Sequence, residues 1–308
     1  MKERRGVNGD SQHWDALALW RSLRPAQWTK NGVVLAPFIF AFGDRALTLD
    51  WPALGVVLLA ALSFCLLASA IYLFNDVRDQ AEDRMHPVKK LRPIAAGDLS
   101  PRIALGTGAL LAVVALGVAL AVTPVLAGVL AGYAAMQVVY TLGLKRVALV
   151  DVFVIAAGFV LRALAGAVAI AVPISPWLLL CTLLLALFLA LCKRRHERVV
   201  LNRSAESSRA SMRTYDAALL DQLISMVGAA TVVCYALYTL WPDTVEKFGT
   251  HALGFTIPFV LFGLFRYLDL VYRHEQGGQP ERLLLTDKPL LANLGLYGLT
   301  VVLVLLLR

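Results

Sequence analysis

Residues 52–83 read PALGVVLLAALSFCLLASAIYLFNDVRDQAED, and they join the two features that decide the fold. The 23 positions from Pro52 to Phe74 are almost wholly apolar, and a helix needs only about 20 such residues to cross a bilayer. The next nine positions carry four carboxylates. A membrane-spanning helix that ends in acids predicts a polar site at the membrane boundary.

Apolar stretches of similar length recur along the whole chain. Its 308 residues are 59% hydrophobic and 16% charged, with a mean hydropathy of +0.70, whereas soluble domains carry about 25% charged residues. We therefore predict an all-α polytopic membrane protein that forms one transmembrane domain over residues 1–308. The nine predicted transmembrane helices lie near 32–48, 52–74, 102–122, 124–143, 148–171, 175–192, 218–240, 252–272 and 289–307.

The positive charges are distributed unevenly between the two sides of such a bundle. With nine spans, 24 of the 29 Lys and Arg residues fall on the side of the N-terminus, and three fall on the other side. Cytoplasmic loops of membrane proteins are enriched in Lys and Arg. We expect this face, including a polar segment 1–30 without a cleavable signal pattern, to be cytoplasmic. The same rule accounts for the net charge of +8, so nucleic-acid binding is not expected.

The acids after Phe74 predict a metal site. If the helix continues, Asp76, Asp79 and Asp83 fall on one face at i, i+3 and i+7, with Asn75 beside them. Mg²⁺ binds through a few protein oxygens and completes its shell with water and substrate phosphates. The alternative is a solvated helix end in which Arg78 pairs with Glu82, which lies off the aspartate face.

The pattern Asn75-Asp76-Asp79-Asp83 resembles the first aspartate-rich motif of the UbiA-type intramembrane prenyltransferases. That resemblance implies a helical bundle with a cytoplasm-facing cavity, and a Mg²⁺ cofactor that holds a diphosphate. It also implies a bacterial plasma-membrane enzyme with its active site toward the cytoplasm.

The second acidic motif of the quinone-type members is missing. Residues 191–200 read LCKRRHERVV instead, with Glu197 among cations. Together with RPAQWTKN (24–31), KKLRPIAAG (89–97) and PERLLLTD (280–287), this segment resembles the decaprenyl-phosphate phosphoribosyltransferase branch of the family. The resemblance implies that phosphoribosyl pyrophosphate donates 5-phosphoribosyl to a polyprenyl phosphate, in a bacterial arabinan precursor pathway.

Such a donor carries a 5-phosphate besides its diphosphate, so cations are needed at two places. The candidate phosphate-binding residues are Lys30, Lys89, Arg92, Lys145, Lys193 and Arg194. Further candidates for substrate contacts are Arg24, Gln27, Asn31, Tyr140, Arg162, Glu197, Arg266 and Asp287. Some of the basic residues would equally serve as positive-inside anchors that meet lipid head groups, and Tyr140 is also typical of an interfacial aromatic residue.

Arg162 is predicted to lie deep in the bilayer. It follows Asp151 by about 16 Å of helix, and an intramembrane arginine usually faces a cavity or a partner. Two interpretations stay open: a structural pair with a buried acceptor, and a contact to a substrate anion at the deep end of the cavity. Arg266 lies near a helix end and can reach the interface.

Two other functions are considered. An aromatic prenyltransferase would use a prenyl diphosphate on the same fold, but the missing second acidic motif argues against it. A secondary transporter or lipid carrier would place its site near the midplane, often between repeated halves, whereas these acids lie at the boundary. A homo-oligomer stays open.

Overall fold

The computed structural model describes residues 16–44, 51–203, 216–274, 277–278 and 280–307, and within them it contains helices and no strand. Among the described residues, eight helical segments are long and apolar enough to cross a membrane. Seven of them are α3 (Trp51–Arg78), α6 (Pro101–Val122), α7 (Pro124–Leu142), α8 (Val150–Ala169), α9 (Pro176–Arg203), α11 (Ala217–Leu240) and α15 (Lys288–Leu306). The eighth, Ala252–Tyr272, combines the 3₁₀ helix η4 (Ala252–Thr256) with α13 (Ile257–Tyr272). They confirm the all-α membrane bundle and eight of the nine predicted spans.

The first predicted span, 32–48, is not one continuous helix in the described residues. The chain forms α1 (Ala16–Leu23), the 3₁₀ helix η1 (Pro25–Leu35) and the short helix α2 (Ala36–Phe42); residues 45–48 of the predicted span lie outside the described part. Pro25 and Pro37 lack the N–H that a continuing α-helix needs, which favours separate short pieces. The nine-helix prediction is therefore wrong for this segment.

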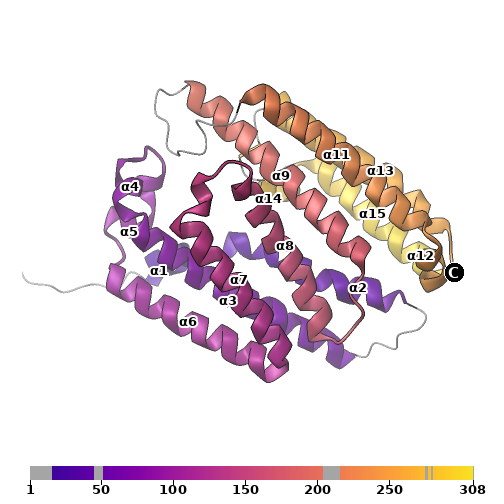
Figure 1. Cartoon of the computed structure of the whole chain (residues 1–308), viewed down its shortest axis with the longest axis horizontal. Helices are drawn as coiled ribbons and strands as arrows, with labels where there is room; N and C mark the ends of the chain where they lie inside the picture. The colour runs from indigo at the N-terminus through magenta and orange to yellow at the C-terminus, as the bar shows by residue number, and fades with distance from the viewer. Residues whose placement is uncertain (1–15, 45–50, 204–215, 275–276, 279, 308) are drawn as a thin grey trace, which may run out of the picture.

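The broken segment still runs from one end of the bundle to the other. Arg24, at its start, contacts Asp76 at the end of α3. Asp44, after α2, pairs at 3.2 Å with Lys247 in α12 (Pro242–Phe248). In Figure 1, α12 lies at the opposite end of the bundle from the short helices α4 (Gln80–Met85) and α5 (Pro93–Ala96).

A glycine lets this segment lie inside the bundle. A Cβ atom built on Gly166 of α8 would stand 1.9 Å from the carbonyl oxygen of Val34 in η1. Close approach of two backbones through small residues is typical of packing in membranes. Val34 is fully buried, in a core cluster with Phe64 of α3 and Tyr133 of α7.

A second core cluster unites the other half of the chain. Phe188 of α9, Ile224 of α11 and Tyr267 of α13 are among its buried members, and α8 packs against α9 between the halves. Many large hydrophobic side chains, among them Leu110, Val113 and Leu299, are exposed on the surface of the bundle, as expected for helices surrounded by lipid.

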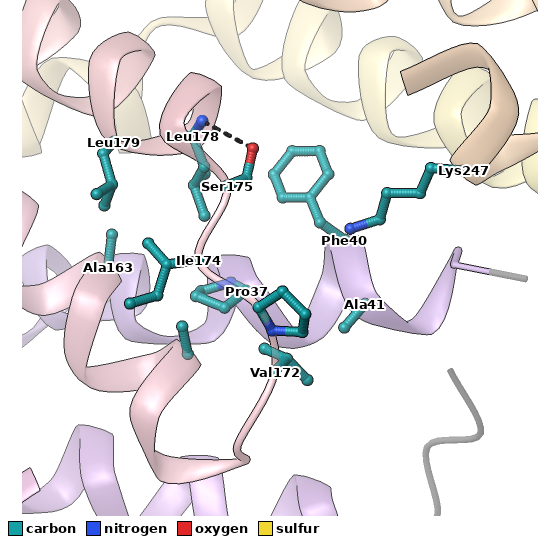
Figure 2. A pocket seen from close by; sticks show the side chains of 12 residues that line it. Pro37, Phe40, Ala41, Ala163, Val172, Ile174, Ser175, Leu178, Leu179 and Lys247 are labelled. Atoms are coloured by element: carbon teal, nitrogen blue, oxygen red, sulfur yellow. Dashed lines mark hydrogen bonds between the residues drawn. The ribbon is translucent and has the colours of Figure 1, made fainter. Parts of the chain in front are cut away.

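A small cavity lies at the end that carries α12. Figure 2 shows its lining, with Pro37 and Phe40 of α2 facing Ile174 and Leu178 across it. Its volume is about 20 Å³, which is room for little more than one water molecule. This cavity cannot take a substrate, and the candidate site residues lie mainly at the other end. The predicted cytoplasm-facing cavity stays a prediction.

Candidate active site

The predicted acidic residues lie where α3 passes into α4. The backbone N–H of Asp79 donates to Asn75 at 2.9 Å, and that of Asp83 donates to Asp79 at 2.9 Å, so the helical path continues through the break at Asp79. Asp76 and Asp83 are seven positions apart and fall on one face, both 3% exposed. Asp79 lies about 60° around the helix from Asp76.

Arginines bind the two buried carboxylates. The Arg24 Nη2 atom lies 2.5 Å from the Asp76 Oδ1 atom. The Arg92 Nη1 atom lies 3.1 Å from the same oxygen and 2.6 Å from the Asp83 Oδ2 atom. One guanidinium nitrogen thus joins both acids.

Asp79 has a separate partner. The Lys145 Nζ atom, from the 3₁₀ turn η3 (Leu144–Arg146) after α7, lies 2.9 Å from each of its carboxylate oxygens. The helical spacing of the three aspartates is kept, but Asp79 pairs with Lys145 of η3 and not with the two arginines. We call Asp76, Asp79, Asp83, Arg24, Arg92 and Lys145 the acid site.

Local sequence explains where the two arginines lie. Arg24 has φ 55° and ψ 58°, a left-handed conformation that non-glycine residues adopt at a cost and that concentrates at functional sites. The side chain of Ser69 in α3 accepts from Trp28 at 3.0 Å and donates to Leu23 at 2.9 Å, which fixes this turn. Arg92 precedes Pro93 and is extended, as residues before proline are.

The neighbours of the acids have structural partners. Asn75 accepts a 2.7 Å hydrogen bond from Thr141 of α7. Glu82 is mainly exposed, 3.9 Å from Arg146, which confirms that it lies off the aspartate face. Arg78 does not pair with it, because its guanidinium reaches the Leu142 carbonyl oxygen at 3.4 Å.

The acid site fits Mg²⁺ by its donor chemistry. Asp76 and Asp83 offer carboxylate oxygens, the ligands that this hard cation prefers, and Mg²⁺ needs only one or two carboxylates besides water and phosphate. Within the described residues, no three His, Cys, Asp or Glu side chains are grouped as in a complete protein cage. Arg92 forms ion pairs with both Asp76 and Asp83, whereas Asp79 pairs with Lys145.

The basic run of α9 forms a second cluster. Arg194 is 2% exposed and pairs with Asp151 of α8 at 2.9 Å and with Glu197. Tyr140, at the end of α7, lies near Arg194, and its substrate contact stays a prediction. Asp151 is fully buried and was not predicted as a partner, although an acid at the start of an apolar stretch is a usable signal.

The next arginine joins three helices. The Arg195 Nε atom lies 2.6 Å from Asp221 of α11, and its guanidinium lies 3.7 Å from the ring centroid of Tyr272 in α13. Tyr272 also donates to Asp221 at 2.7 Å. Arg194 and Arg195 therefore link α9 to α8, α11 and α13 at this end. A phosphate that bound either arginine would have to compete with its carboxylate partner.

Arg162 is surrounded by neutral groups. Its guanidinium donates to Asn31 at 2.7 Å, to the Gly158 carbonyl at 2.8 Å and to Tyr133 at 2.9 Å. Among the described residues, no carboxylate pairs with it. The structural interpretation therefore has a specific set of partners, and contact with a substrate anion stays a prediction.

The remaining candidates lie around these clusters. Arg266 pairs with Asp269 at 2.7 Å and with Asp287 at 2.8 Å. The hydrogen bond from Arg266 to Asp287 lowers the pKa of the Asp287 carboxyl below its ordinary value. Partly buried positions are occupied by Gln27, Lys30, Lys89 and Lys193; their phosphate or substrate contacts stay predictions.

A comparison with known families gives the wider relationship. A profile described as the UbiA prenyltransferase family matches residues 34–286. The chain belongs to this family. Membership in a family of enzymes decides against the transporter alternative.

Several similar proteins carry one name. The chain is 36% identical over 294 residues to the decaprenyl-phosphate phosphoribosyltransferase of Mycolicibacterium smegmatis, with 91% of each chain covered. It is 36% identical over 270 residues to the Mycobacterium tuberculosis protein of that name, with 88% of each covered. A UbiA homolog from Archaeoglobus fulgidus, bound to DMAPP and Mg²⁺, has a TM-score of 0.69 at 19% identity, covering 94% of this chain and 100% of that one. That likeness supports the fold.

Proposed function

We propose that this protein transfers 5-phosphoribosyl from phosphoribosyl pyrophosphate to the phosphate of a polyprenyl lipid such as decaprenyl phosphate, and that pyrophosphate leaves. The observation that carries the proposal is the 36% identity to decaprenyl-phosphate phosphoribosyltransferases over about nine-tenths of both chains. We further propose Mg²⁺ dependence and a role in arabinan precursor synthesis.

The acid site supports binding of a diphosphate. Asp76 and Asp83, with Asn75 and Asp79 nearby, would hold Mg²⁺. When bound, the metal would neutralise the negative charge that develops on the leaving pyrophosphate. Arg24, Arg92 and Lys145 stand within hydrogen-bond distance of these carboxylates, so they are near enough to reach phosphate oxygens on the same ligand.

The 5-phosphate would need cations outside the acid site. Lys30, Lys89 and Lys193 are our candidates for this contact. Arg194 would also serve if it gave up Glu197, which is 28% exposed, while keeping buried Asp151. This division between diphosphate and 5-phosphate accounts for a basic segment where other family members carry acids.

The reaction requires little proton transfer by the protein. The acceptor phosphate is an anion at neutral pH, so we assign no catalytic base. Carbon 1 of the ribose passes through an oxocarbenium-like state, as in other glycosyl transfers. The protein's part is to align donor and acceptor and to place Arg24, Arg92 and Lys145 where negative charge accumulates.

The charge distribution supports a location in the bacterial plasma membrane with the acid site toward the cytoplasm. The acid site lies at the end of the bundle that carries most of the basic loops, which positive-inside topology would place in the cytoplasm. The lipid phosphate would then meet a soluble donor at the membrane boundary.

The test is a reconstituted reaction. Purified protein in lipid nanodiscs is incubated with radiolabelled phosphoribosyl pyrophosphate, polyprenyl phosphate and Mg²⁺, and we expect radiolabel in the lipid fraction. An Asp83→Asn variant, expected to turn over at least about tenfold more slowly, is the impaired control, and Glu82→Gln is its matched active control. Consumption of a prenyl diphosphate with an aromatic acceptor, without labelled lipid from the ribosyl donor, would overturn the proposal.

A further inference from the structure

The acid site contains as many cationic side chains as carboxylates. Arg24 binds Asp76, Arg92 binds both Asp76 and Asp83, and Lys145 binds Asp79. Three cationic side chains thus balance the charge of three carboxylates. A site prepared only for a cation would leave its acids open, whereas this one already holds positive charge at each acid.

The two arginines lie on the open side of the acids that they bind. The side chains of Arg24 and Arg92 are 27% and 30% exposed, and those of Asp76 and Asp83 are 4% exposed. The third pair has the reverse order, since Lys145 is 16% exposed and Asp79 is 26% exposed. At Asp76 and Asp83, a ligand that enters from solvent therefore meets guanidinium groups before it meets carboxylates. Both arginines are long and partly exposed, so they can turn toward an incoming anion.

A divalent cation by itself fits this arrangement poorly. To reach the Asp76 Oδ1 and Asp83 Oδ2 atoms together it must displace Arg92, which then loses two anionic partners at once. The metal ion and the displaced guanidinium of Arg92 would repel each other. Leaving a charged side chain without a partner in a partly buried site also costs free energy. A metal that arrives with a diphosphate brings phosphate oxygens, with which the displaced arginine and lysine side chains can pair.

We propose that Arg24, Arg92 and Lys145 are exchangeable counterions: they hold the acids until a metal–diphosphate complex binds, and they then transfer to its phosphate oxygens. This inference rests on the proposed function for the presence of a diphosphate, and it assigns these residues a role in the order of binding. Metal and diphosphate enter together, because each supplies the partner that the other displaces.

The exchange predicts opposite effects of one substitution. In Arg92→Gln the acids lose their shared cation, so metal alone should bind more tightly. The same variant lacks a donor for the phosphate, so metal with pyrophosphate should bind more weakly. A hydrogen bond to a charged group corresponds to roughly a 10- to 100-fold change in affinity, and we expect about tenfold in each direction.

The experiment measures binding without turnover. Mn²⁺ replaces Mg²⁺ as a spectroscopic probe, and its free concentration over purified protein is followed by electron paramagnetic resonance, with and without inorganic pyrophosphate. The matched control is Lys90→Gln, which removes the same charge from an exposed side chain two positions away. It should change neither affinity by more than about twofold, because surface charges act weakly.

Each outcome bears on the proposal. Tighter Mn²⁺ binding alone, with weaker binding in the presence of pyrophosphate, supports the exchange. Equal or weaker binding of Mn²⁺ alone to Arg92→Gln overturns it. If that variant is misfolded by circular dichroism, Arg24→Gln is read by the same criterion, since Arg24 binds only Asp76 of the three acids.

The two proposals fail differently. If wild-type protein makes the labelled lipid but the variants lack the reversed effects, the exchange is overturned and the function stands. If wild-type protein binds Mn²⁺ with pyrophosphate and the variants show the reversal, while no ribosylated lipid forms, the exchange stands and the donor is wrong. If Mn²⁺ does not bind in either condition, the exchange is overturned together with the metal site.

Discussion

Replacing Arg162 by methionine should destabilise the bundle. Of its three hydrogen bonds, the one to Gly158 lies within α8, whereas those to Asn31 and Tyr133 join α8 to η1 and to α7. Hydrogen bonds between membrane helices contribute about 0.6 kcal/mol on average and up to about 1.7 kcal/mol. The two bonds between segments therefore predict a loss of about 1–3 kcal/mol.

Two further effects act in opposite directions. The guanidinium carbon lies 4.9 Å from the Tyr133 ring centroid and 5.3 Å from that of Phe159, and cation–π contacts add roughly 0.5–2 kcal/mol. Methionine removes the cost of burying a charge, which offsets part of the loss. We keep about 1–3 kcal/mol as the expected net loss in free energy of unfolding.

Reversible unfolding in mixed detergent and SDS micelles measures this free energy. Arg146→Met is the control, because Arg146 is 62% exposed and lies 3.9 Å from Glu82; we expect a change within about 0.5 kcal/mol. A double-mutant cycle with Asn31→Ala should give a coupling of about 0.6–1.7 kcal/mol. Unchanged or increased stability of Arg162→Met, with weaker substrate binding, would refute the structural role and favour contact with a substrate anion.

Three other expectations test the site and the fold. Asp83→Asn should lower turnover at least about tenfold, because metal charge on the leaving group is worth several kcal/mol, whereas Glu82→Gln should be mild and excess EDTA should abolish activity. Lys90→Cys should react with an impermeant maleimide in inside-out vesicles and stay unlabelled in intact cells, and the reverse pattern would invert the topology. Copper phenanthroline should cross-link Cys181 to Cys234, whose Sγ atoms lie 3.5 Å apart, so that a chain cut between α9 and α11 stays joined until reduced; separation of the pieces would contradict the packing of these helices.

Hydropathy was sufficient to predict eight spans, because each is a long apolar stretch whose partner is lipid or another apolar helix. It could not predict how the first span is built. Asn31 of that segment accepts from Arg162, 131 positions away, and such a partner leaves no local pattern. The two prolines were visible, but their effect depends on whether distant groups satisfy the backbone around them.

The placement of the aspartates followed from sequence better than the pairing within the acid site did. Helical spacing predicted that Asp76 and Asp83 lie on one face, and the structure agrees. The same spacing could not show that Asp79 turns to Lys145, which lies 66 positions further along the chain. Arg24 was a candidate only through the resemblance of its motif, since no spacing rule connects it to Asp76.

Through the contact between Gly166 and Val34, a residue far from the acid site affects the position of Arg24 beside Asp76. One added methyl group would push η1 off α8, because the 1.9 Å approach to a backbone oxygen leaves no room for it. Since η1 begins next to Arg24, the displacement would travel along the segment and draw a guanidinium away from Asp76. Natural variation at position 166 should therefore be confined to glycine, with selection acting on the distance between two backbones and only indirectly on the reaction.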